Sequence, residues 1–157
     1  MFHIFNAPRA YTSVYAPYYD RFNFYDGREA WLKSISEIPK KAVDLFCVHW
    51  LHLEVYNGGF WQYFYNSTAT SAPEAQEGFK AIGMQSVADI VEEAMVRLGT
   101  PYPMEKSVRE KIVGSPQDRM DFDALDAAFY EAADTDTFFR KLPKFVPFAN
   151  AYAQTFN

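Results

Sequence analysis

Two adjacent glycines, Gly58 and Gly59, interrupt a long apolar segment and limit how this chain can fold. Residues 40–56 are apolar on nearly every side of a helical wheel, which is typical of a central helix with neighbours all round. Consecutive glycines readily adopt the left-handed geometry of a helix C-terminus, so we expect the helix to stop at Asn57 and to restart over residues 60–65. The two segments predict a bent helical hairpin at the centre of the fold.

Helical periodicity continues on both sides of this hairpin. Apolar spacing, together with glycines and prolines at segment ends, predicts helices over 28–37, 74–82, 103–113 and 120–132, and one that Ser86 caps and Gly99 closes. From residue 135 onward we expect two short helices with a kink between them, because prolines interrupt an apolar pattern there. No segment shows sustained alternation of apolar and polar residues, so the sequence predicts an all-α fold.

Residues 1–27 are rich in tyrosine, phenylalanine, proline and asparagine and show neither helical nor strand periodicity. Exposing so many aromatic rings would favour aggregation. We therefore expect residues 1–27 to pack as an aromatic arm on one compact helical domain that spans residues 28–157. A chain of 157 residues fits a single domain.

Composition and targeting signals narrow the class of protein. Apolar residues make up 49% of the chain, too many for a disordered protein, and interspersed charges leave no membrane-spanning run. The start of the chain lacks an export signal, so a cytoplasmic location is the default. The single cysteine, Cys47, lies in an apolar run and is expected to be a buried, reduced thiol. Phosphate-loop and nucleophile-elbow motifs are missing from the sequence, and we expect no cofactor.

Charge is distributed unevenly along the chain. The formal net charge is −5, yet the region from Asp118 to Asp136 holds seven acids and one base, Arg119, for a local balance of −6. The seven acids are Asp118, Asp121, Asp123, Asp126, Glu131, Asp134 and Asp136. Such a run is often a solvated helix face, but it could also form an acidic surface that attracts a basic protein. The cations are scattered and form no stripe, so direct nucleic-acid binding is not expected.

His49, His52 and Glu54 superficially resemble a metal or catalytic cluster. At about 100° per residue, the two histidines lie about 60° apart on a helix, while Glu54 points about 160° away from His52. A metal would need further ligands from elsewhere, and the chain holds only one other histidine, His3. We therefore expect no metal site, and the histidines are expected to form hydrogen bonds at a packed helix interface.

Glu54 falls on an apolar face of its predicted helix, so its carboxylate must find polar partners. The nearest candidates are the backbone N–H groups of the glycine turn, where negative charge is favoured. Asn57, Gln62 and Asn66 could extend the same polar network. This pattern predicts a structural brace of the turn, with a catalytic acid as the alternative.

Residues 54–66, EVYNGGFWQYFYN, followed by Ala81 to Gly83 and by the segment from Leu125 to Tyr130, resemble the bacterial family of DNA-mimic-protein-like domains of unknown function. The resemblance implies an all-helical fold and, for the namesake of the family, an acidic homodimer that occupies the DNA-binding surface of a repressor. Apart from Glu54, the residues of the shared motif are glycine, aromatic and amide types that look architectural. The motif comprises Glu54, Asn57, Gly58, Gly59, Phe60, Gln62 and Asn66.

Three hypotheses about function follow. The leading one is a non-enzymatic acidic protein that binds a basic DNA-binding regulator or a toxin through the acids between Asp118 and Asp136. The second is a small enzyme or metal-binding protein that uses Glu54 with His49 or His52. The third is a structural homodimer in which the aromatic arm packs on the partner copy.

Overall fold

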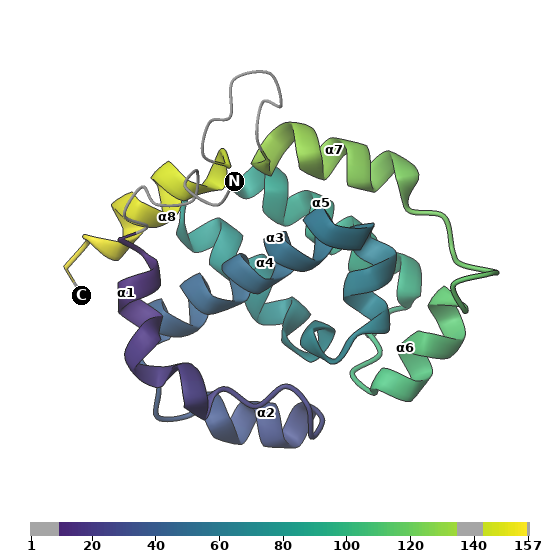
Figure 1. The fold of residues 1–157 in the computed structure, drawn as a ribbon, viewed down its shortest axis with the longest axis horizontal. Coiled ribbons are helices and arrows are strands. Elements are labelled where there is room, and N and C mark those ends of the chain that lie inside the picture. The colour runs from purple at the N-terminus through teal and green to yellow at the C-terminus, as the bar shows by residue number, and fades with distance from the viewer. Residues whose placement is uncertain (1–9, 135–142, 157) are drawn as a thin grey trace, which may run out of the picture.

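The computed structural model describes residues 10–134 and 143–156, and within these ranges the chain forms helices and loops without a strand (Figure 1). The all-α fold predicted from the sequence is confirmed. The α-helices of the described residues are α1 (Thr12–Tyr15), α2 (Arg28–Ile35), α3 (Lys40–Tyr65), α4 (Ala72–Ala81), α5 (Gln85–Leu98), α6 (Lys106–Val113), α7 (Asp123–Ala133) and α8 (Phe145–Ala153). Two 3₁₀ segments, η1 (Ala16–Arg21) and η2 (Ser67–Ser71), precede α2 and α4.

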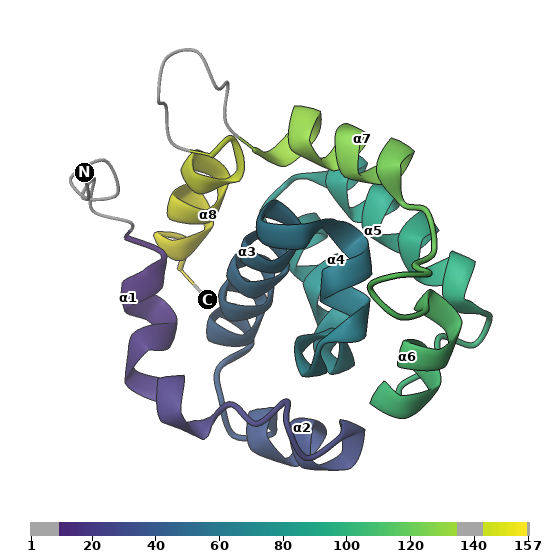
Figure 2. The same ribbon diagram turned by 45° about the vertical axis from the view of Figure 1, so that its right-hand side comes forward.

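Helix α3 is the central element, and the other helices surround it and α4 (Figure 2). Most of the α3 side chains are buried, as the apolar pattern predicts. Its backbone is broken at Gly58 (φ −154°, ψ 21°) and Gly59 (φ 72°, ψ −178°). The predicted interruption is therefore confirmed, and the second half of α3 has a helix N-terminus of its own.

The N-terminal region contains short helices that its sequence does not indicate. Residues 10–27 include α1 and η1, although they show no helical periodicity. Tyr11 and Tyr15 are buried against α3, and the rings of Phe22 and Phe46 stack with centroids 3.6 Å apart. Burial of two aromatic side chains four residues apart stabilises a helix too short for sequence periodicity to reveal. Residues 1–9 of the predicted arm lie outside the described residues.

Several helix boundaries also differ. Helix α5 begins at Gln85, and no side chain caps it, so the predicted Ser86 cap was wrong. Helix α8 begins at Phe145 with Pro147 in its first turn, where a missing N–H removes no helical hydrogen bond. Residues 135–142, which belong to the predicted pair of kinked helices, lie outside the described residues.

A buried arginine on α6, which sequence patterns did not indicate, ties the end of α3 to the rest of the core. Arg109 is fully buried. Its guanidinium donates to the backbone oxygens of Phe64 (3.2 Å) and Asn66 (3.3 Å) at the C-terminal end of α3, and to those of Pro103 (3.3 Å) and Met104. The negative end of a helix dipole favours a cation at this position.

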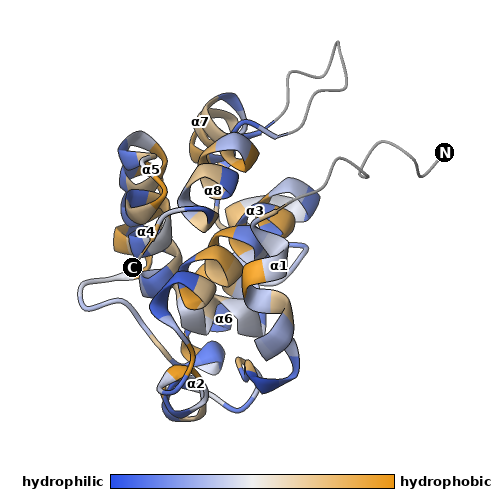
Figure 3. Cartoon of the chain, turned by 90° about the vertical axis from the view of Figure 1, so that its left-hand side faces the viewer, coloured by the Kyte–Doolittle hydropathy of each residue, from blue (hydrophilic) through white to orange (hydrophobic). Residues whose placement is uncertain are grey.

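Hydrophilic and hydrophobic positions alternate around most of the helices, as expected for amphipathic helices on a common core (Figure 3). None of the helices in the described ranges carries an apolar stretch of the length that a bilayer crossing requires.

Candidate functional site

The break in α3 is held by a carboxylate from α7. The backbone N–H of Phe60 donates to Asp126 Oδ1 at 2.7 Å, at the N-terminus of the second half of α3, where negative charge is favoured. A Cβ on Gly59 would lie 2.3 Å from Asp126 Oδ2, so a side chain at this position would displace the carboxylate. Asp126 is half-buried, and burial raises the pKa of its carboxyl above the ordinary value although the Phe60 hydrogen bond opposes the shift.

Glu54 braces the same region through side chains. Its carboxylate accepts hydrogen bonds from Gln62 Nε2 (2.7 Å), Asn66 Nδ2 (2.9 Å) and Thr68 Oγ1 (2.9 Å). Asn57 Nδ2 donates to Gln62 Oε1 at 3.2 Å, so the structure brings the predicted polar residues together. The expectation that Glu54 accepts a hydrogen bond from the backbone of the turn was wrong for Phe60. The N–H of Phe60 donates to Asp126 instead.

Thr68 was not predicted as part of this network. It lies in η2, beyond the end of α3, and the Glu54 carboxylate reaches it only because the chain turns back after Asn66. A threonine in a short loop has no sequence signal that would point to such a role.

The histidines lie in neighbourhoods different from that of Glu54. His49 Nδ1 is 3.0 Å from Tyr11 Oη, and His52 Nε2 is 3.4 Å from Asp134 Oδ1. In the part of the chain that the structure describes, no three His, Cys, Asp or Glu side chains gather closely enough to hold a metal. Cys47 is buried, and its burial raises the pKa of its thiol.

A small cavity of about 230 Å³ adjoins Glu54, between α3, η2 and α6. Its walls include Phe24, Tyr25, Trp50 and Lys106, but neither His49 nor His52. The described residues therefore do not assemble the predicted arrangement of Glu54 with a histidine.

The predicted acidic residues divide into two groups. Asp118, Asp121, Asp123 and Glu131 are exposed. Asp134 is only 6% exposed and faces His52, and Asp126 points at the α3 break, so the expectation that these two contribute to an outer surface is corrected. Both turn inward because α7 packs against α3 and α5 along that side. Asp136 lies outside the described residues.

A second set of exposed acids on α5 enlarges the negative surface. Asp89, Glu92 and Glu93 are exposed on α5, which packs along α7 in the opposite direction (Figures 1 and 2). Arg97, at the end of α5, donates to the backbone oxygen of Asp121 near the start of α7 at 3.4 Å. We call the exposed acids on α5, on α7 and just before α7 the acidic band. It comprises Asp89, Glu92, Glu93, Asp121, Asp123 and Glu131.

Few cations offset the acidic band. Among the described residues, Glu93 is its only member in a salt bridge, with Arg97 at 3.4 Å. Lys80 pairs with Glu77 and also interacts electrostatically with Asp89 and Glu92 of the band. Arg119 lies over the ring of Trp61 with 5.6 Å between the guanidinium carbon and the ring centroid. The members of the band are each exposed, on α5, on α7 or just before α7. The sequence pattern predicts that the acids of α5 lie on the polar side of an amphipathic helix. It does not predict that this helix lies beside α7.

Asp126 binds the α3 break whereas its neighbour Asp123 is exposed, and this difference leads to a first prediction. Asp126→Asn keeps an oxygen that accepts from Phe60 N–H, so we expect the free energy of unfolding to change by less than about 0.5 kcal/mol at pH 7, whereas Asp126→Ala should lower it by about 1–2 kcal/mol. Burial raises the pKa of Asp126 in the folded state, so ionisation of this carboxyl lowers the free energy of unfolding of the wild type as the pH rises above about 3.9. Asp126→Asn has no carboxyl at this position and should not show that decrease.

Urea denaturation at several pH values measures both effects, with Asp123→Asn on the exposed face as the matched control. If Asp126→Asn and Asp126→Ala lower the free energy of unfolding equally, Asp126 does not stabilise the fold through its hydrogen bond to Phe60.

Fold and site together describe an all-α protein with exposed acids on α5 and α7 and a glycine break that Asp126 and Glu54 support. A family model of DMP19-like proteins matches residues 36–149, well over half of the chain. The chain belongs to this family of proteins similar to DNA mimic protein 19, which confirms the resemblance seen in the motif from Glu54 to Asn66. Comparisons with curated proteins and with solved structures found no significant match.

Proposed function

We propose that this protein is a non-enzymatic binding protein of the DNA-mimic type, which occupies the DNA-contacting surface of a basic regulator. The observation that carries the proposal is the acidic band on α5 and α7, together with membership of the DMP19-like family. The acids of the band are exposed and, Glu93 apart, meet no cation in a salt bridge within the described residues. They are available to the lysines and arginines of a partner.

The geometry of the band suits such a partner. Asp89 and Glu93 lie one helical turn apart, about 6 Å along α5, and packed helices lie about 8–10 Å from each other. The carboxylates of α5 and α7 would thus take the place of the two rows of phosphates that a DNA-binding surface contacts. A protein that neutralises phosphates with lysine and arginine would meet carboxylates here instead.

Neutralising the band tests this function and is our second prediction. Asp89→Asn, Glu92→Gln, Asp123→Asn and Glu131→Gln, combined in one variant, should reduce capture of DNA-binding proteins from the native cell extract at least about tenfold and flatten its salt dependence. Quantitative mass spectrometry of the captured proteins measures the loss. Added duplex DNA should release the captured proteins from the wild type.

The control variant carries the same number of charge-removing changes on other exposed acids: Asp20→Asn, Glu29→Gln, Glu37→Gln and Glu105→Gln. We expect it to capture as much as the wild type. Equal losses in both variants would indicate an effect of net charge alone, and capture that duplex DNA does not reverse would argue against mimicry.

A further inference from the structure

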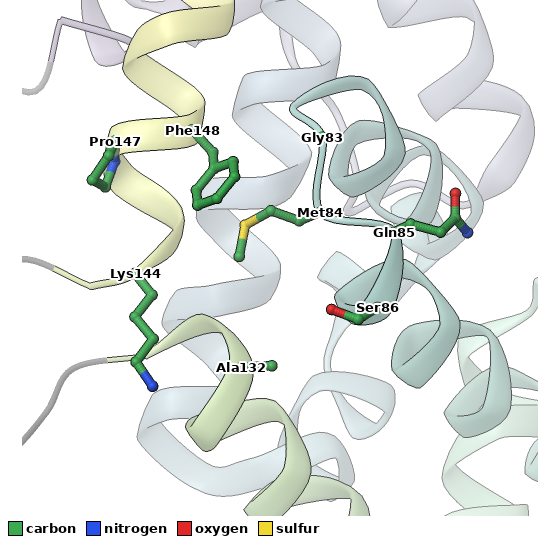
Figure 4. A pocket seen from close by; sticks show the side chains of 8 residues that line it. All are labelled: Gly83, Met84, Gln85, Ser86, Ala132, Lys144, Pro147 and Phe148. Atoms are coloured by element: carbon green, nitrogen blue, oxygen red, sulfur yellow. The ribbon is translucent and has the colours of Figure 1, made fainter.

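A groove of about 850 Å³ lies at one end of the acidic band (Figure 4). It lies between α8, the end of α7 and the turn that connects α4 to α5. We call it the α5–α8 groove, and its main lining residues are Gly83, Met84, Ser86, Ala132, Lys144 and Phe148. Its volume lies in the range of roughly 300–1,000 Å³ that pockets for small ligands occupy.

Part of the groove lining is apolar. Figure 4 shows the ring of Phe148 beside the thioether of Met84, with Ala132 on the neighbouring helix. Met84 is buried, whereas Phe148 is 45% exposed. An aromatic ring left this open beside other apolar side chains is the kind of surface that a partner covers.

The position of the groove relates it to the acidic band. Ser86 lies one turn before Asp89 on α5, and Ala132 directly follows Glu131 on α7. The lining carries one cation, Lys144, whose Nζ donates to the backbone oxygen of Glu131. A segment of a binding partner that lies along the acidic band would therefore reach the groove at its α8 end. The rest of that segment would contact the exposed carboxylates of α5 and α7.

We propose that the α5–α8 groove receives a large apolar side chain, aromatic or aliphatic, that protrudes from a basic segment of the protein partner. This inference rests on the proposed function and adds the chemistry of the segment that is recognised. Charge complementarity selects a basic segment and speeds association, whereas a buried apolar side chain at the core of an interface lengthens the lifetime of the complex.

Labelled peptides test the groove through fluorescence anisotropy, and this is our third prediction. The first probe has a central tryptophan between two runs of four lysines, the second has serine at the centre, and the third has tryptophan between two runs of four glutamates. The wild type should bind the lysine–tryptophan peptide about tenfold more tightly than the lysine–serine peptide. Raising the salt concentration should weaken both by the same factor, since their charges are equal.

Two groove variants should abolish this preference and leave binding of the lysine–serine peptide unchanged. Phe148→Ser removes the apolar wall, and Ser86→Tyr fills the space with a side chain on an exposed position. Phe156→Ser is the matched control, because it removes a fully exposed ring outside the groove, and it should keep the tenfold preference. Circular dichroism checks that each variant remains folded.

The outcomes separate the groove from the band. Equal binding of the two lysine peptides by the wild type would overturn the groove proposal and leave the acidic band intact. Tighter binding of the glutamate–tryptophan peptide would assign the groove to an acidic partner and overturn the proposal. If neither lysine peptide binds at low salt, the proposed function fails and the groove proposal fails with it.

Discussion

Replacing Arg109 with methionine is expected to lower the free energy of unfolding by about 3 kcal/mol. The guanidinium donates to the backbone oxygens of Phe64, Asn66, Pro103 and Met104 inside the core. Methionine has a similar length but no hydrogen-bond donor, so these oxygens would lose the guanidinium as their partner. The substitution would also remove the free-energy cost of burying the positive charge. The first effect outweighs the second because a buried polar group without a partner costs about 1–3 kcal/mol.

Urea denaturation followed by circular dichroism measures this loss. Arg119→Met is the matched control, since Arg119 is exposed and lies over the ring of Trp61, and it should cost less than about 1 kcal/mol. A loss below about 1 kcal/mol for Arg109→Met would mean that water or a shift of α6 replaces the donor, and that Arg109 does not hold the end of α3.

Gly59→Ala is expected to destabilise the protein by a similar amount, about 3 kcal/mol, for two reasons. Its φ of 72° is strained for any residue with a side chain, which costs about 1–2 kcal/mol. The added Cβ would also lie 2.3 Å from Asp126 Oδ2 and push the carboxylate away from the N–H of Phe60. Thermal or urea unfolding measures the sum.

Gly27 separates the two contributions. It has a φ of 90°, and no atom lies within 4 Å of a Cβ built on it, so Gly27→Ala carries the strain without the clash. It should cost about 1–2 kcal/mol. In a double-mutant cycle, Gly59→Ala should cost less in the Asp126→Ala background, because the displaced carboxylate is gone. Additive losses would show that Asp126 and Gly59 are not coupled.

Local patterns predicted the helices and the break well. The apolar pattern of residues 40–56 and the two glycines identified α3 and its interruption, because backbone freedom and burial of one face act within a few residues. The polar network of Glu54, Asn57, Gln62 and Asn66 was predictable for the same reason, because its members lie close in sequence on the two sides of the break. Family membership followed from this motif as well.

Several expectations depended on packing that sequence patterns do not report. Asp126 and Asp134 look like their exposed neighbours in sequence, but the packing of α7 turns them toward the α3 break and His52. Burial of Arg109 against backbone oxygens also had no local signal. The cytoplasmic location, the homodimer and the boundary between arm and domain stay predictions.

Two kinds of information thus account for this protein. Its sequence alone determined the helical class, the central apolar helix and the place where that helix breaks, since these depend on the propensities of neighbouring residues. Only the tertiary structure decided which carboxylates face solvent and which hold the break, and that the acids of α5 lie beside those of α7. Such placements arise when distant segments compete for the same buried volume, so the outcome depends on helix packing.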